Sequence, residues 1–142
     1  MPTRTAEATW KGGLKAGSGS FSGESGAIKG DYSFGSRFEN ADGTNPEELL
    51  AAAEAACFSM ALSLALESAG LEPKSVHTTA ECTIEKGDGG FSITTMKLSV
   101  VGDVPGADAA VFRELAEKTR DGCPVSKALA GNVAIEVEAR LA

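Results

Sequence analysis

Three cysteines are the residues of this 142-residue chain best suited to do chemistry: Cys57, Cys82 and Cys123. A cysteine acts as a nucleophile or metal ligand through its thiolate, so its environment decides its reactivity. The three show no CxxC spacing, and with a single histidine, His77, a zinc cluster is not expected. The first residues lack the apolar core of a signal peptide, which predicts a cytoplasmic protein. In the cytoplasm, an odd number of cysteines favours free or redox-active thiols over structural disulfides.

The surroundings of each thiol leave more than one interpretation open. Cys57 lies in an apolar stretch, where a cysteine is usually a small core residue and where burial raises its pKa. A reactive Cys57 therefore needs a cation beside it. Cys123 precedes Pro124 at an expected helix N-terminus, which favours a thiolate, although it could simply replace a capping serine. Cys82 alternates with apolar residues of an expected strand, which predicts a buried core position.

Arg37 is the cation to weigh, although it could be an ordinary surface arginine. A guanidinium lowers the pKa of a neighbouring thiol without acting as a base, and Glu47 could hold it in a bidentate pair. Alternatively, Glu47 only complements the helix dipole. Ten residues separate Glu47 from Cys57. This is roughly 15 Å along a helix, so one arginine cannot easily touch both within one chain. Two such helices packed antiparallel in a twofold dimer would bring the groups together.

Glu47 and Cys57 lie on one long helix, which is expected over residues 45–70. Asn45 is a suitable N-cap, Pro46 suits the first helical position, and Gly70 suits the left-handed stop. Between 49 and 66 the helix is apolar except for Glu54 and two serines, so it must be buried on nearly all sides. The chain has little material to surround it, which predicts a second subunit. A membrane span is disfavoured by Glu54 and by the lack of basic flanks.

The rest of the chain alternates short strands with two further helices. The apolar pattern of the strand after residue 90 slips by one position, which indicates either a bulge or an edge in the pattern. The order is βββ-α-ββ-αα-β, an α+β fold in a single domain over residues 1–142. The expected strands are 5–11, 18–22, 32–38, 75–86, 91–101 and 132–141, and the expected later helices are 108–120 and 125–130.

Charge narrows the class of partner. The net charge is −7, and lysine and arginine are scattered without forming a basic stripe. Nucleic acids and anionic membranes carry negative charge and are therefore not expected to bind.

Three segments together resemble the OsmC/Ohr family of thiol-dependent peroxidases. They are TNPEEL (44–49), ACF (56–58) and CPVS (123–126). The resemblance runs nearly from end to end, starting at Trp10, and is closer to the OsmC branch (osmotically induced protein C) than to the organic hydroperoxide resistance branch.

The resemblance implies an OsmC-like fold in an intertwined homodimer with active sites at the subunit interface. Cys57 matches the peroxidatic cysteine, and Cys123 matches the resolving cysteine that forms a disulfide with it. Arg37 and Glu47 match the pair that activates the thiolate, although in the other branch the arginine comes from an earlier position. Cys82 has no match. The implied substrate is an organic hydroperoxide and the implied reductant a lipoyl-type dithiol, in a response to oxidative or osmotic stress, without metal, haem or flavin.

Two alternatives stay open. The same fold could serve as a redox sensor or small-molecule-binding protein in which the cysteines switch without turnover. A purely structural dimer would require Cys57 and Cys123 to lie far apart, because a disulfide needs Cα atoms within about 7 Å. The role of Glu54, at the dimer contact or in the site, is left open as well.

Overall fold

The computed structural model describes all 142 residues. The chain falls into two compact units, Met1–Leu49 and Leu50–Ala142. The boundary passes through the first turn of the long helix α2 (Pro46–Ser68). The single domain over residues 1–142 stays a prediction.

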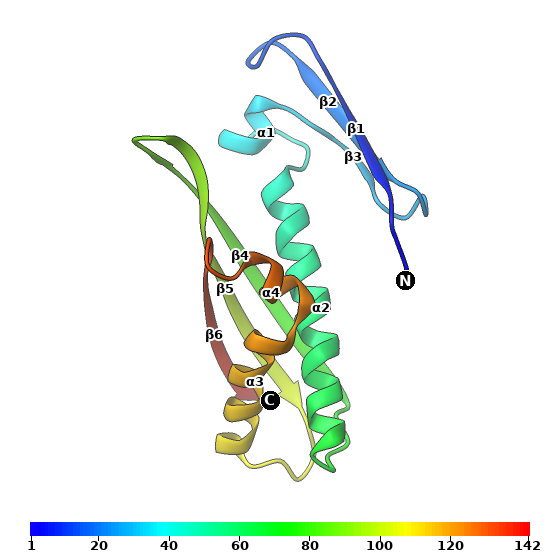
Figure 1. Ribbon diagram of the computed structural model, residues 1–142, viewed down its shortest axis with the longest axis vertical. Helices are drawn as coiled ribbons and strands as arrows, with labels where there is room; N and C mark the ends of the chain where they lie inside the picture. The colour runs from blue at the N-terminus through cyan, green and yellow to red at the C-terminus, as the bar shows by residue number, and fades with distance from the viewer. The chain divides into compact units, whose positions relative to one another are not determined.

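The first unit is built on a three-stranded antiparallel sheet in the order β1-β2-β3 (Figure 1). Its strands are β1 (Ala6–Lys11), β2 (Ser18–Gly23) and β3 (Lys29–Tyr32). The Tyr32 ring packs between Trp10 and Phe21, with ring centroids 5.4 and 6.0 Å away. A Cβ at Gly19 would lie 2.5 Å from the Tyr32 ring, so the glycine leaves room for this aromatic cluster.

The strand expected over residues 32–38 is wrong in its extent. The strand ends at Tyr32, and a short helix follows, α1 (Phe34–Phe38). Ser33 and Ser36 form a capping box, in which the Ser33 N–H donates to the Ser36 hydroxyl at 2.8 Å and the Ser36 N–H donates to the Ser33 hydroxyl at 3.0 Å. This local cap satisfies the first turn and favours helix over strand. The observed order is therefore βββ-αα-ββ-αα-β, still α+β.

Helix α2 begins and ends as its sequence predicts. The Asn45 side-chain oxygen accepts a hydrogen bond from the Glu48 backbone N–H at 2.8 Å, which makes Asn45 the N-cap. At the other end Gly70 has φ of 83°, and the Leu71 N–H donates back to the Leu66 carbonyl. Within the second unit, one face of α2 is fully buried through Phe58, Leu62 and Leu66.

The second unit places helices over a three-stranded sheet (Figure 1). The sheet order is β4 (Ser75–Gly87), β5 (Gly90–Asp103) and β6 (Ala134–Leu141), with β6 parallel to β5. Along β4, exposed and half-buried residues alternate, so one face of the sheet meets the helices. The pairing of β4 with β5 shifts between Thr83 and Ile84, which identifies the slip in the sequence pattern as a bulge.

Two shorter helices complete this unit. They are α3 (Ala109–Gly122) and α4 (Pro124–Leu129). Asp108 caps α3 by accepting the N–H groups of the first turn. The core joins all of these elements, through Phe58 of α2, Met96 and Leu98 of β5, and Phe112 of α3.

Candidate active site

The fold of the second unit brings Cys57 and Cys123 into direct contact. Cys57 lies in the middle of α2, and Cys123 is the residue that begins α4. The Cys123 Sγ donates a hydrogen bond to the Cys57 Sγ over 2.9 Å, and both cysteines are free thiols. Cys123 is fully buried and Cys57 half-buried. The purely structural alternative required these thiols to lie far apart, and the structure contradicts it.

Cys123 does not act as a substitute for a capping serine. It is both the last cap of α3, through a 2.8 Å hydrogen bond from its N–H to the Thr119 carbonyl, and the first cap of α4. Its side chain makes no capping hydrogen bond to α4. The sulfur is therefore committed to Cys57 rather than to the helix that follows it.

The second unit by itself does not activate Cys57. Burial raises the pKa of the Cys57 thiol, and the hydrogen bond and charge of Cys123 together with the charge of Glu54 raise it further. The backbone N–H of Val125, in the first turn of α4, acts in the opposite direction. The thiolate is thus disfavoured, which agrees with the expectation that a reactive Cys57 needs a cation beside it.

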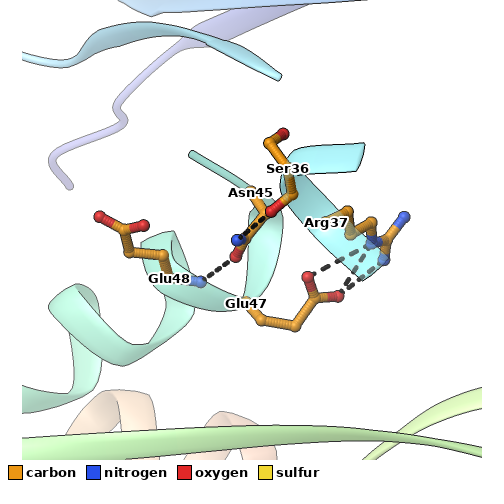
Figure 2. A network of polar contacts seen from close by, with 5 residues as sticks. All are labelled: Ser36, Arg37, Asn45, Glu47 and Glu48. Atoms are coloured by element: carbon orange, nitrogen blue, oxygen red, sulfur yellow. Dashed lines mark hydrogen bonds and ion pairs between the residues drawn. The ribbon is translucent and has the colours of Figure 1, made fainter. Parts of the chain in front are cut away.

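Arg37 and Glu47 form the expected bidentate ion pair in the first unit (Figure 2). Arg37 lies in the last turn of α1 and Glu47 in the first turn of α2. The Arg37 Nη2 lies 2.8 Å from Glu47 Oε1, and its Nε lies 3.1 and 3.3 Å from the two carboxylate oxygens. Asn45 fixes the approach of the two helices, because its Nδ2 donates to the Ser36 carbonyl at 3.0 Å. Glu47 is buried, whereas the Arg37 side chain keeps 35% of its surface exposed.

A second polar pair, which the sequence did not reveal, lies beside the thiols. Glu54 and Ser126 are both completely buried, and the Ser126 hydroxyl donates a hydrogen bond to Glu54 Oε1. The other carboxyl oxygen, Oε2, is buried without a partner. The available signal was spacing, since Glu54 precedes Cys57 by three residues and so shares its helix face.

The protonation of Glu54 gives a testable dependence of stability on pH. Burial raises the pKa of this carboxyl, and the hydrogen bond from Ser126 opposes the rise only in part. The folded protein therefore retains a proton that the unfolded chain releases near its ordinary value of about 4.3. Stability must fall as the pH rises from there toward the higher folded pKa. We expect Glu54→Gln, which stays neutral, to lack this decrease.

The measurement is the free energy of unfolding in urea for both proteins between pH 4 and 8. The difference between the variant and the wild type should grow with pH, and two parallel curves would contradict a raised pKa. The nearest thiol, Cys57, also has a raised pKa and so titrates well above this range.

The remaining candidates lie outside these two groups. Cys82 pairs with Met96 across the sheet and packs against the core, but it is half-buried rather than fully buried as predicted. His77 is exposed on the other face of β4. No group of three or more His, Cys, Asp or Glu side chains is arranged to hold a metal ion.

Two free cysteines in contact in this α+β fold form a dithiol pair that oxidation can convert to a disulfide. The sequence model of the family described as OsmC-like protein matches residues 39–138. The chain is 46% identical over 136 residues to peroxiredoxin OsmC of Escherichia coli K12, covering 95% of each chain. This chain belongs to the OsmC-like family.

Relatives from the hydroperoxide resistance branch also match over nearly the full length. The organic hydroperoxide resistance protein OhrB of Bacillus subtilis is 31% identical over 140 residues, covering 97% of this chain and 98% of that protein. Its crystal structure superposes with a TM-score of 0.74 over 96% of this chain and 98% of that chain, at 29% identity. An organic hydroperoxide resistance protein from Elizabethkingia anophelis gives a TM-score of 0.76 at 28% identity, covering 99% of each chain.

Proposed function

We propose that this protein is a cysteine-based peroxidase that reduces organic hydroperoxides to alcohols. The observation that carries the proposal is the 2.9 Å contact between the free thiols of Cys57 and Cys123. Relatives named peroxiredoxin and organic hydroperoxide resistance protein support the same class of reaction. Such an activity belongs to the response to oxidative or osmotic stress.

Cys57 is the peroxidatic cysteine and Cys123 the resolving cysteine. The Cys57 thiolate attacks the terminal peroxide oxygen, the O–O bond breaks, and the alkoxide leaves as the alcohol after taking a proton. Cys57 is then a sulfenic acid. Cys123 attacks its sulfur, the S–O bond breaks, and hydroxide leaves as water with the proton of the Cys123 thiol. A dithiol reductant of the lipoyl type reopens the disulfide by exchange and becomes oxidised itself.

Arg37 supplies the positive charge that the Cys57 thiolate needs, and Glu47 orients it. Glu47 engages the Nε and Nη2 edge of the guanidinium, so Nη1 stays available for a sulfur or a peroxide oxygen. A guanidinium held in this way loses little further freedom on forming a new contact. We propose that the arginine acts at a site shared between two subunits.

The exposed apolar surface of α2 supports a homodimer. By length and composition alone α2 could cross a membrane. Only 22% of its most apolar window is buried within one chain, so much of its apolar surface is uncovered there. Met60 and Leu64 are 79% and 64% exposed. A groove of about 660 Å³, lined largely by apolar residues of α2 and α3, lies next to Leu64. A second copy of this chain covers this surface in the proposed enzyme, which acts in the cytoplasm and does not bind nucleic acid or membranes.

Thiol titration before and after one equivalent of cumene hydroperoxide tests the proposal. We expect two of the three thiols to disappear, with peptide mass spectrometry showing a link between Cys57 and Cys123. Three unchanged thiols would remove the peroxidase function. Steady-state turnover with dihydrolipoamide then separates an enzyme from a redox sensor, because a sensor consumes a single equivalent of peroxide.

The enzyme should prefer cumene hydroperoxide to hydrogen peroxide. Half-buried Leu50 offers an apolar contact on the helix of Cys57, whereas Phe58 is buried in the core and Met60 belongs to the surface that the second copy covers. Burying an alkyl group of this size is worth roughly 1.5–3 kcal/mol. We therefore expect kcat/KM to be at least about tenfold higher for the organic peroxide. Competition between the two peroxides measures the ratio directly, and equal values would contradict an apolar substrate site.

A further inference from the structure

Helices α2 and α4 are joined at two points with matching spacing. On α2, Glu54 precedes Cys57 by three residues, and at the start of α4, Ser126 follows Cys123 by three residues. Residues three apart lie on the same face of a helix. The thiols meet at one point and the Ser126 hydroxyl meets the Glu54 carboxyl at the other. The contact between the cysteines therefore has a polar neighbour that spans the same two elements.

The burial of the Glu54 carboxyl costs free energy that its one hydrogen bond offsets only in part. It is 0% exposed and its Oε2 has no partner. A buried polar group without its hydrogen bonds costs free energy that an apolar side chain of similar size would not. The peroxidase chemistry described above does not use it. A side chain retained at this cost, directly beside the thiols, points to a function at the site.

Helix α4 cannot hold Cys123 in place by itself. It contains six residues, fewer than an isolated helix needs to be stable. The Cys123 side chain makes no capping bond to it. The Cys123 backbone is held to α3 by its hydrogen bond to the Thr119 carbonyl, but the side of Cys123 that faces α2 also depends on how the first turn of α4 is attached, and Ser126 lies in that turn.

We propose that Glu54 is a positioning residue for the resolving step. By accepting the Ser126 hydroxyl, its carboxyl holds the start of α4 against α2 and keeps the Cys123 sulfur within reach of Cys57. The inference rests on the proposed peroxidase function and adds a residue that acts through Ser126 rather than on the reacting atoms.

Accurate placement matters because two reactions compete for the Cys57 sulfenic acid. Attack by Cys123 forms the disulfide and releases water, whereas a second peroxide molecule oxidises the sulfenic acid to sulfinic acid. A disulfide forms only within a narrow range of Cα and Cβ separations. Loosening α4 should therefore slow the first reaction and leave the second unchanged.

The test follows Cys57 by mass spectrometry in the full chain after excess cumene hydroperoxide. In Glu54→Ala and Ser126→Ala we expect disulfide formation to slow by about tenfold and the sulfinic acid to increase. Glu54→Gln keeps an acceptor for Ser126 and should resolve as the wild type does. The double variant Glu54→Ala/Ser126→Ala should be no worse than either single variant, because both lose the same contact.

Two controls separate positioning from general loss of structure. Ser59→Ala removes another hydrogen bond of α2, the 2.8 Å contact of its hydroxyl with Thr78, and should leave resolution unchanged. The rate of the first oxidation, measured in a Cys123→Ser background, should not fall in Glu54→Ala, because the charge of Glu54 raises the pKa of Cys57 and its loss favours the thiolate. Diamide, which oxidises thiol pairs without a peroxide, should reproduce the slower disulfide formation.

Normal disulfide formation in both Glu54→Ala and Ser126→Ala would overturn the inference, as would a Glu54→Gln variant as defective as Glu54→Ala. Failure of the underlying function gives a different result, because Cys57 of the wild type would then not be oxidised by the peroxide at all. If Glu54→Ala does not fold, Ser126→Ala and the diamide measurement decide.

Discussion

Replacing Cys57 by serine is expected to reduce peroxide turnover to the uncatalysed background, whereas Cys123→Ser should still consume a first equivalent of peroxide per chain rapidly. A serine hydroxyl has too high a pKa to attack the O–O bond, so the first variant cannot begin the cycle. In the second variant the Cys57 sulfenic acid forms but has no thiol within 2.9 Å to capture it. Peroxide consumption in single-turnover and multiple-turnover experiments distinguishes the two cases.

The third thiol provides the matched control. Cys82 packs on the core side of β4, so Cys82→Ser should retain turnover within about twofold of the wild type. In Cys123→Ser, continued exposure to peroxide should convert Cys57 to sulfinic acid, which dithiols do not reduce. Full multiple turnover by Cys123→Ser would mean that Cys123 is not the resolving cysteine.

Removing the guanidinium should have the next largest effect. Because the second unit raises the pKa of Cys57, loss of an activating cation should leave the thiol protonated at neutral pH. We expect Arg37→Ala to lower kcat/KM by about 10²- to 10³-fold, as for loss of an electrostatic stabiliser in other enzymes. Arg37→Lys keeps the charge but loses the paired contact with Glu47, so its kcat/KM should lie between the values of the wild type and Arg37→Ala.

The pH dependence of Cys57 alkylation by iodoacetamide gives the readout. The midpoint should move to higher pH in Arg37→Ala and remain in place in Arg113→Ala, which removes an exposed arginine of α3. An unchanged alkylation profile in Arg37→Ala would show that another group activates the thiol.

Mixing Arg37→Ala chains with Cys57→Ser chains tests whether two subunits share a site. If each site takes Cys57 from one subunit and Arg37 from the other, a mixed dimer holds one intact site. Equal mixing should then restore roughly a quarter of the wild-type activity. No recovery would place both residues in the site of a single chain.

Local signals predicted the elements whose ends are fixed by neighbouring residues. The cap at Asn45 and the stop at Gly70 follow from residues close in the sequence, whereas the slip in the pattern of β5 left a bulge and an edge equally open until the strand pairing identified it. The strand predicted over residues 32–38 was wrong for a related reason. Its aromatic residues resemble a strand pattern, but the serine pair at 33 and 36 forms a cap that only a helix can use.

The site was predicted only in part because its contacts are long-range. The pairing of Arg37 with Glu47 could be expected from their charges and from the loop that joins them. The contact of Cys57 with Cys123 joins residues 66 positions apart, so spacing could not reveal it, and only the family resemblance suggested it. Glu54 stood out as a charge in an apolar helix, yet its partner, Ser126, depends on how α4 packs.

The boundary between the two units at residues 49 and 50 affects how the newly made chain reacts with oxidants before the subunits assemble. The thiols belong to the unit Leu50–Ala142, and the ion pair of Arg37 with Glu47 belongs to the unit Met1–Leu49. Under the proposed mechanism, a newly made chain carries a protonated cysteine that reacts slowly with oxidants. The Cys57 thiol then becomes reactive only when two subunits assemble and Arg37 reaches it, so the unassembled chain is protected from oxidation of this sulfur.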